Sequence, residues 1–65
     1  MSLALSRHSG ESLFLHLTPG ADVEKLLKQL ATTGIKIRLG EIRGSRVKIH
    51  IDAPDDISIA REEVL

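Results

Sequence analysis

The chain of 65 residues is 42% hydrophobic, has a single aromatic residue, Phe14, and carries nine basic and nine acidic residues. It lacks cysteine, which excludes disulfides and thiolate metal sites, and its three scattered histidines lack ligand-like spacing, so we expect neither a metal nor another cofactor. Because the formal net charge is zero, the composition argues against a bulk electrostatic attachment to nucleic acid or to an anionic membrane, while it permits a local basic patch.

Two short strands are predicted at the start of the chain. Residues 2–7 (SLALSR) alternate, with Leu3 and Leu5 on one face, which is typical of a strand near the edge of a sheet. Gly10 indicates a turn, because glycine adopts backbone angles that other residues avoid. Residues 12–17 (SLFLHL) form the second strand, and the short connection makes the two strands a candidate hairpin.

A helix is predicted at about residues 21–32, because four apolar side chains recur there at the helical spacing i, i+3, i+4 and i+7. Asp22 is one candidate for the N-cap, and Thr18 followed by Pro19 is the other. Gly34 suits the exit from the helix. The apolar stripe consists of Val23, Leu26, Leu27 and Leu30.

The second half of the chain predicts a hairpin and a last strand. Residues 35–42 (IKIRLGEI) and 46–52 (RVKIHID) alternate inward apolar and outward polar side chains, and Gly44 lies in the turn between them. Ala53–Pro54 ends the second of these strands, since proline has no N–H to donate. Residues 56–60 (DISIA) form the fifth strand.

The predicted elements follow the order ββαβββ in one domain, residues 1–65, a small five-stranded α+β fold that is mostly β. A chain of this length buries only about 60% of its unfolded surface, and it has no disulfide or metal to stabilise it. We therefore expect an obligate homodimer. No stretch approaches the roughly 20 apolar residues of a membrane span, and the first ten residues are too polar for a signal peptide, so a cytoplasmic location is expected.

Arg61 occupies an unusual position in the last predicted strand. Side chains two residues apart in a strand point the same way, so Arg61 shares a face with Ile57 and Ile59. A charged side chain does not normally share a face with two isoleucines that favour burial. Arg61 is then either a surface residue paired with Glu62 or Glu63, or a residue that binds a ligand.

Two segments of the chain resemble the carbon storage regulator family (CsrA/RsmA), small bacterial post-transcriptional regulators that bind messenger RNA. They are LSRHSGESLFL (5–15) and IKIRLGEIRGSRVKIHIDAPDDISIAREEVL (35–65). Family members open with Leu-Thr-Arg-Arg and a Gly-Glu turn, and close with an Ala-Pro loop, a last strand and Arg-Glu-Glu. The corresponding motifs here are Leu5-Ser6-Arg7-His8, Gly10-Glu11, Ala53-Pro54 and Arg61-Glu62-Glu63.

The position of the helix departs from the usual family pattern. Most members carry a helix after the last strand, whereas this sequence places its helix in the interior. In this respect the chain resembles the RsmN (RsmF) subgroup, in which the helix is inserted between the second and third strands. The resemblance implies an intertwined, β-rich homodimer. A second departure is His8, which stands where the family often has a second arginine.

The resemblance also implies a binding site for single-stranded or hairpin-loop RNA that contains GGA. The planar guanidinium of Arg61 matches guanine O6 and N7 with two parallel donors. With one aromatic residue the chain cannot build a platform for base stacking, so the rest of the readout falls to backbone groups at exposed strand edges. Phosphate contacts are expected from Lys36, Arg38 and Lys48. The implied RNA-binding residues are Leu5, Arg7, His8, Ala53, Pro54, Ile59 and Arg61.

By this resemblance the protein represses translation by occupying the ribosome-binding region of mRNA. Its implied partners are mRNA leader regions, small regulatory RNAs with GGA loops and a second copy of the chain, and they include neither a membrane nor DNA. An alternative is a CsrA-like protein-interaction module, hetero-dimerising or antagonist-binding, with weak or no RNA binding. We do not expect an enzyme, because no nucleophile–base pair, paired acidic site or phosphate loop stands out in the sequence.

Overall fold

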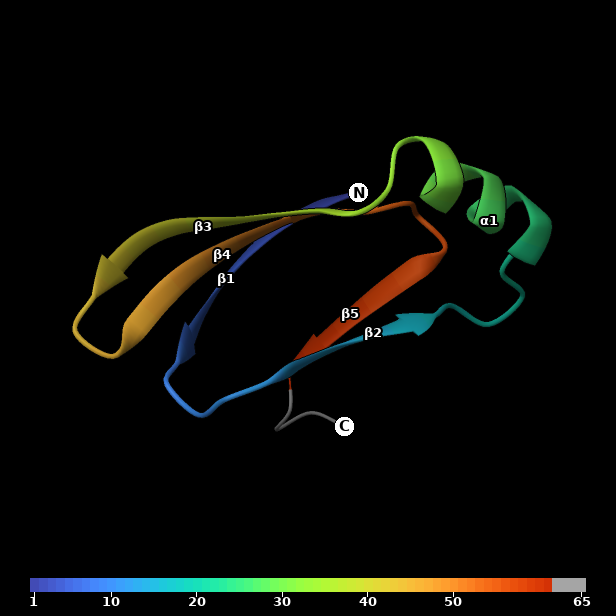
Figure 1. Cartoon of the computed structure of the whole chain (residues 1–65). Helices are drawn as coiled ribbons and strands as arrows, with labels where there is room; N and C mark the ends of the chain where they lie inside the picture. Colours follow the sequence, from blue (N-terminus) through green and yellow to red (C-terminus); the bar gives the residue numbers. More distant parts are fainter. Residues whose placement is uncertain (62–65) are drawn as a thin grey trace.

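The computed structural model describes residues 1–61. These residues form five strands and one helix in the order ββαβββ, so the predicted order is confirmed. Figure 1 shows how the elements are arranged. No helix among these residues is long and apolar enough to cross a membrane. The elements are β1 (Ser2–His8), β2 (Leu13–Leu17), α1 (Val23–Thr32), β3 (Lys36–Arg43), β4 (Arg46–Asp52) and β5 (Ile57–Arg61).

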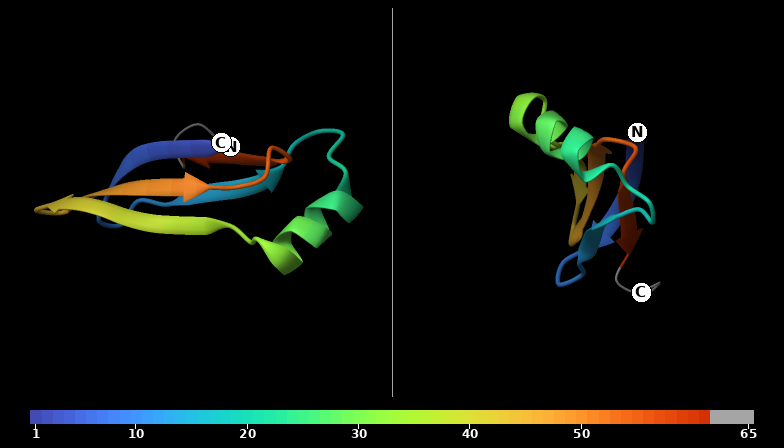
Figure 2. Two further views of the ribbon diagram at one scale, coloured as in Figure 1. Left: turned by 90° about the horizontal axis from the view of Figure 1, so that it is seen from above. Right: turned by 90° about the vertical axis from the view of Figure 1, so that its right-hand side faces the viewer.

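The strands form two antiparallel sheets. One has three strands in the order β1-β4-β3, and the other pairs β2 with β5. Figure 2 shows the two-stranded sheet beneath the three-stranded one, with β5 on the side of β1 and with α1 at one end of both sheets. The core lies between these layers and consists of Leu5, Leu26, Ile51, Ala53 and Ile57.

The candidate hairpin between the first two strands is wrong, because β1 and β2 belong to different sheets. β1 pairs along all seven of its residues with β4, from Ser2 opposite Asp52 to His8 opposite Arg46. This register places Leu3 and Leu5 beside Ile51 and Ile49, so that β1 extends an apolar sheet face. A hairpin with β2, which has five residues, would have paired β1 over a shorter length than its ladder with β4 does.

The hairpin of β3 and β4 is confirmed, with Gly44 at a φ of 57° in its turn. A β-bulge shifts the register between Leu39 and Ile42, so that two residues of β3, Gly40 and Glu41, lie opposite one residue of β4. The extra residue moves Ile42 onto the same face as Leu39. Without it, Glu41 would have continued the apolar face.

α1 begins at the predicted N-cap Asp22, whose carboxylate accepts a hydrogen bond from the backbone N–H of Lys25 at 3.1 Å. Only one residue of its apolar stripe is buried, Leu26, which is 3% exposed. Leu27, the next residue of the same apolar stripe, is 60% exposed to solvent. The helix therefore presents part of its apolar face to the outside of this chain.

The sequence of the three-stranded sheet separates its two faces by chemistry. The inner face, which looks toward β2 and β5, carries rows of apolar side chains that lie in register across the three strands, such as Leu3, Ile51 and Ile37. The outer face carries cross-strand rows such as Ser2, Asp52 and Lys36, and Ala4 is its one apolar side chain on these three strands. Several apolar side chains of the inner face stay exposed in a single chain, and Leu39 and Ile42 of β3 are 63% and 66% exposed.

Candidate nucleic-acid interface

A groove of about 350 Å³ lies between β1 and β5, the first and last strands of the described chain. Within residues 1–61, β1 pairs only with β4 and β5 pairs only with β2, so each strand keeps one edge without a neighbouring strand. The free backbone N–H and C=O groups of such an edge form a regular row of donors and acceptors. The groove is lined by Leu3, Ala4 and Leu5 of β1 and by Ile59, Ala60 and Arg61 of β5.

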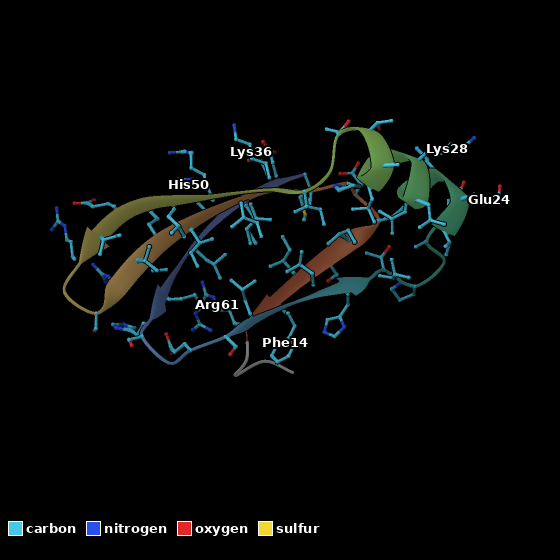
Figure 3. The ribbon with its side chains drawn as sticks, viewed as in Figure 1. Phe14, Glu24, Lys28, Lys36, His50 and Arg61 are labelled. Atoms are coloured by element: carbon cyan, nitrogen blue, oxygen red, sulfur yellow. The ribbon has the colours of Figure 1, made fainter. Side chains whose placement is uncertain are left out.

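Arg61 stands at the end of this groove. It is the last residue of β5, it is exposed, and it lies opposite Leu13 of β2 in the ladder. Figure 3 shows it at the tip of β5, near β1. Ile59, two residues earlier, is half-buried against the core. Arg61 therefore places five N–H donors beside an apolar groove and next to two strand edges.

Arg7 lies elsewhere, on the inner face of β1, where it is only 6% exposed. Its Nη1 donates a hydrogen bond to the carbonyl of Ser12 at 2.8 Å, and its Nη2 lies 3.3 Å from Oε2 of Glu11. The other carboxylate oxygen of Glu11 accepts a hydrogen bond from the backbone N–H of His8 at 2.6 Å. This network fixes the turn between β1 and β2, so the side chain of Arg7 holds the C-terminal end of the strand that lines the groove.

His8 ends β1 and is exposed, opposite Arg46 of β4. Since paired residues of neighbouring strands point to the same face, its imidazole belongs to the outer face of the three-stranded sheet. It does not line the groove. His8 and Arg61 are therefore presented on different surfaces of the molecule.

Ala53 and Pro54 line a second hollow of about 340 Å³, which lies between the β4–β5 loop and the C-terminal end of α1. Ala53 is buried, and its N–H and C=O groups both pair with the backbone of Met1, at 2.9 and 2.7 Å. The carbonyl of Pro54 accepts a hydrogen bond from the N–H of Ile57 at 3.0 Å. The loop is thus held in one conformation at the far end of β5.

Comparison with known proteins gives the chain its family. Residues 2–65 match the model of the CsrA global regulator protein family. The chain belongs to the CsrA family. A similar protein is the translational regulator CsrA of Halothermothrix orenii (strain H 168 / OCM 544 / DSM 9562), which is 55% identical over 31 residues. The aligned segment covers 48% of this chain and 38% of that relative, so the chain spans less than half of the relative's length.

Of the seven residues that the sequence predicts for the site of this CsrA family chain, three line the groove: Leu5, Ile59 and Arg61. Of the remaining four, Ala53 and Pro54 line the second hollow. Arg7 lies in the network that fixes the turn after β1, and His8 lies on the outer face. Their roles in binding stay predictions. Glu62 and Glu63, the predicted alternative partners of Arg61, lie outside the described residues.

The groove of the CsrA family chain also contains Leu3, Ala4 and Ala60, which are not among the seven predicted site residues. Leu3 lies on the same face of β1 as Leu5, so its alternation with polar neighbours was a usable signal. Ala4 and Ala60 carry no such signal. Their small side chains line the groove only because the fold brings the edges of two distant strands together.

Proposed function

We propose that this chain is a sequence-specific RNA-binding regulator that recognises GGA-containing single-stranded or hairpin-loop RNA. By occupying the ribosome-binding region of an mRNA, it represses translation. The observation that carries this proposal is the position of Arg61, exposed at the end of an apolar groove between two free strand edges. Membership of the CsrA family supports it, and so does the similarity to the Halothermothrix orenii protein, which is named a translational regulator.

The chemistry of the groove suits guanine in an unpaired loop. The guanidinium of Arg61 donates two parallel hydrogen bonds to O6 and N7, a contact worth about 1–3 kcal/mol of discrimination between bases. Leu3, Leu5 and Ile59 exclude water around this contact, which strengthens it. The edges of β1 and β5 supply backbone donors and acceptors to the neighbouring bases. Base edges are accessible in this way only where RNA is unpaired.

The other predicted residues act around this groove. Arg7 positions β1 through the buried turn network with Glu11 and Ser12. Ala53 and Pro54 contact the RNA where it leaves β5 at its N-terminal end, and His8 contributes a weaker contact from the outer face. Targets are mRNA leader regions, and small regulatory RNAs with GGA loops compete for the same groove.

The regulator acts as a homodimer of the RsmN/RsmF type, with its helix inserted between the second and third strands. The exposed apolar side chains of α1 and β3, including Leu27, Leu39 and Ile42, support this assembly. When a second copy covers these apolar side chains, they are removed from water, and this burial stabilises the dimer. Two-fold symmetry then gives the dimer two equivalent grooves.

A gel-shift series tests the proposed function. A hairpin with GGA in its loop is compared with the same hairpin in which only that triplet is changed. We expect clear preference for the first RNA. Equal binding to both would remove sequence-specific recognition.

A protein-interaction module is the second candidate, and the exposure of Leu27 on α1 favours it. In that case α1 docks a paralogue or a protein antagonist, and the groove binds RNA weakly or not at all. The same gel shift separates the two functions, because this candidate predicts no shift with either hairpin at micromolar protein.

A further inference from the structure

The outer face of the three-stranded sheet collects cations to an extent that the neutral chain does not suggest. The registers of β1, β4 and β3 place five of the nine basic residues on this face. Figure 3 shows Lys36 and His50 projecting from the sheet on the side away from β2 and β5. The five basic residues are Lys36, Arg38, Arg43, Arg46 and Lys48, and we call this set the basic face.

Four of these cations are unengaged. Arg43 pairs with Glu41, the bulge residue, at 2.6 Å. The side chains of Lys36, Arg38, Arg46 and Lys48 form no ion pair or hydrogen bond within residues 1–61, and all four are exposed. The charge of the basic face is therefore available to a ligand from outside the chain.

Two shallow hollows give the basic face its shape. One of about 190 Å³ is lined by Ser6, Arg46 and Lys48 together with the Glu41–Arg43 pair. The other, of about 200 Å³, is lined by Ser2, Lys36, Arg38 and His50, and also by Ile51 and the acidic residue Asp52. Both hollows are bounded on one side by β1, the strand whose opposite edge lines the groove. A single strand thus separates the basic face from the groove.

The chemistry of the basic face fits phosphate better than protein. Its outward positions on β1, β3 and β4 carry no apolar side chain larger than that of Ala4, whereas protein interfaces are anchored by buried aromatic or aliphatic groups. Arg46, Lys48 and His50 follow one another along β4 at every second residue, about 6.7 Å apart. Such a row of donors can follow the backbone of a nucleic acid, and backbone contacts position it without reading its sequence.

We propose that the basic face is a second RNA-contacting surface, which binds the phosphate backbone of the segments that flank the triplet held in the groove. This inference rests on the proposed function, because it takes the RNA in the groove as the source of those segments. The RNA passes from the groove across the small outward side chains Ser2, Ala4 and Ser6 of β1 to the cations of β4 and β3. The basic face adds affinity for long RNA and leaves sequence preference to the groove.

The test uses the variant Arg38→Gln/Lys48→Gln in the full chain, with Lys25→Gln/Lys28→Gln on the exposed side of α1 as a control of equal charge. Binding is measured for a short single-stranded GGA oligonucleotide and for a long hairpin with a GGA loop and flanking strands. We expect the basic-face variant to bind the hairpin about 10-fold more weakly and the slope of log K against log salt to fall by about 1.5. The short oligonucleotide is affected less than about 2-fold, and the control variant matches the unmodified protein.

The charge-preserving swap Arg38→Lys/Lys48→Arg should restore hairpin binding, which separates charge from any effect on folding. Equal hairpin affinities of the basic-face and control variants would overturn the proposal. Binding of polyglutamate, a model of an acidic protein, is measured with the same variants. If the basic-face variant loses affinity for polyglutamate but not for RNA, the proposal is overturned and the surface is assigned to an acidic protein. If the unmodified protein shows no GGA preference while the variant still loses hairpin binding, the proposed groove function fails and the basic face stands.

Discussion

Nη2 of Arg7 lies 3.3 Å from Oε2 of Glu11, so a buried guanidinium is neutralised by a carboxylate four residues later in a non-helical turn. This contact joins the end of β1 to the connection that leads into the other sheet. It also accounts for an arginine on an otherwise apolar sheet face, in a row with Val47 and Ile42.

Arg7→Ala should lower the free energy of unfolding by about 2–4 kcal/mol, because it removes the buried hydrogen bond to the carbonyl of Ser12 and the cation beside the carboxylate of Glu11. Glu11→Gln should cost about 1 kcal/mol, since the Glu11 side chain is partly exposed and an amide still accepts a hydrogen bond. Urea denaturation followed by far-ultraviolet circular dichroism measures both. Unchanged stability of Arg7→Ala, together with lost RNA binding, would make Arg7 a direct contact residue.

Arg61→Ala should weaken binding to a GGA hairpin by roughly 30- to 150-fold, which corresponds to about 2–3 kcal/mol for the lost bidentate contact. Because Arg61 is exposed at the end of β5, the unfolding free energy should change by less than about 1 kcal/mol. Arg61→Lys should recover only part of the affinity, since an ammonium cannot reproduce the planar fork. Normal binding by Arg61→Ala, with a normal melting curve, would show that the groove is not the site of guanine recognition.

His8→Arg should tighten binding by about 0.5–1.5 kcal/mol without changing the preference for GGA. The new guanidinium would stand opposite Arg46 on the outer face, where it adds a constant charge near the phosphate backbone. Titration of a GGA hairpin and of its altered counterpart measures both quantities. A gain limited to the GGA hairpin would instead place residue 8 against a base.

Gly40→Ala should destabilise the fold by about 1–2 kcal/mol, an overpacking cost. A Cβ at this position of the bulge would lie 3.0 Å from Nε2 and 3.1 Å from Cδ2 of the His50 ring. The double variant Gly40→Ala/His50→Ala should lose less than the sum of the two single variants, because the ring is then gone. Additive losses in urea denaturation would show that the carbonyl of Lys48, 3.3 Å from the same Cβ, sets the cost.

The protein should sediment at micromolar concentration with twice the mass of one chain. Leu39 and Ile42 are 63% and 66% exposed in a single copy, and their burial by a second copy is worth more than 1 kcal/mol for each side chain. Leu39→Asp should therefore shift the sedimentation equilibrium toward monomer, whereas Lys28→Asp on the polar side of α1 should not. A folded monomer of the unmodified chain under these conditions would contradict the prediction.

Local patterns in the sequence predicted the elements well. The helix expected at about 21–32 spans Val23–Thr32, and the strand expected at 56–60 spans Ile57–Arg61. Hydrophobic period and capping residues are read within a few positions of the chain, so they fix an element without knowledge of its neighbours.

The pairing of the strands was harder to predict from the sequence. Gly10 and a short connection suggested a hairpin of β1 and β2, yet β1 pairs with β4 through contacts such as Ser2 with Asp52. Such contacts depend on which strand elsewhere in the chain can pair with β1 over the greater length and with its apolar face on the same side. Residue patterns within a few positions of β1 carry no information about this. The burial of Arg7 was hidden for the same reason, because the sequence shows its charge but not the layer that covers it. The groove was predicted only through Leu5, Ile59 and Arg61, whose partners lie at the opposite end of the chain.

The groove between β1 and β5 has a consequence for the timing of synthesis. Its two walls come from the first and last described strands, and β1 is held by its pairing with β4, whose partners are 38 residues (His8 and Arg46) to 50 residues (Ser2 and Asp52) apart in the chain. Folding dominated by such distant pairings is slow compared with folding through local contacts. A nascent chain that has not yet released β5 from the ribosome lacks one wall and Arg61 altogether. If the groove binds RNA as proposed, an incomplete chain therefore cannot bind through it to the mRNA from which it is being translated.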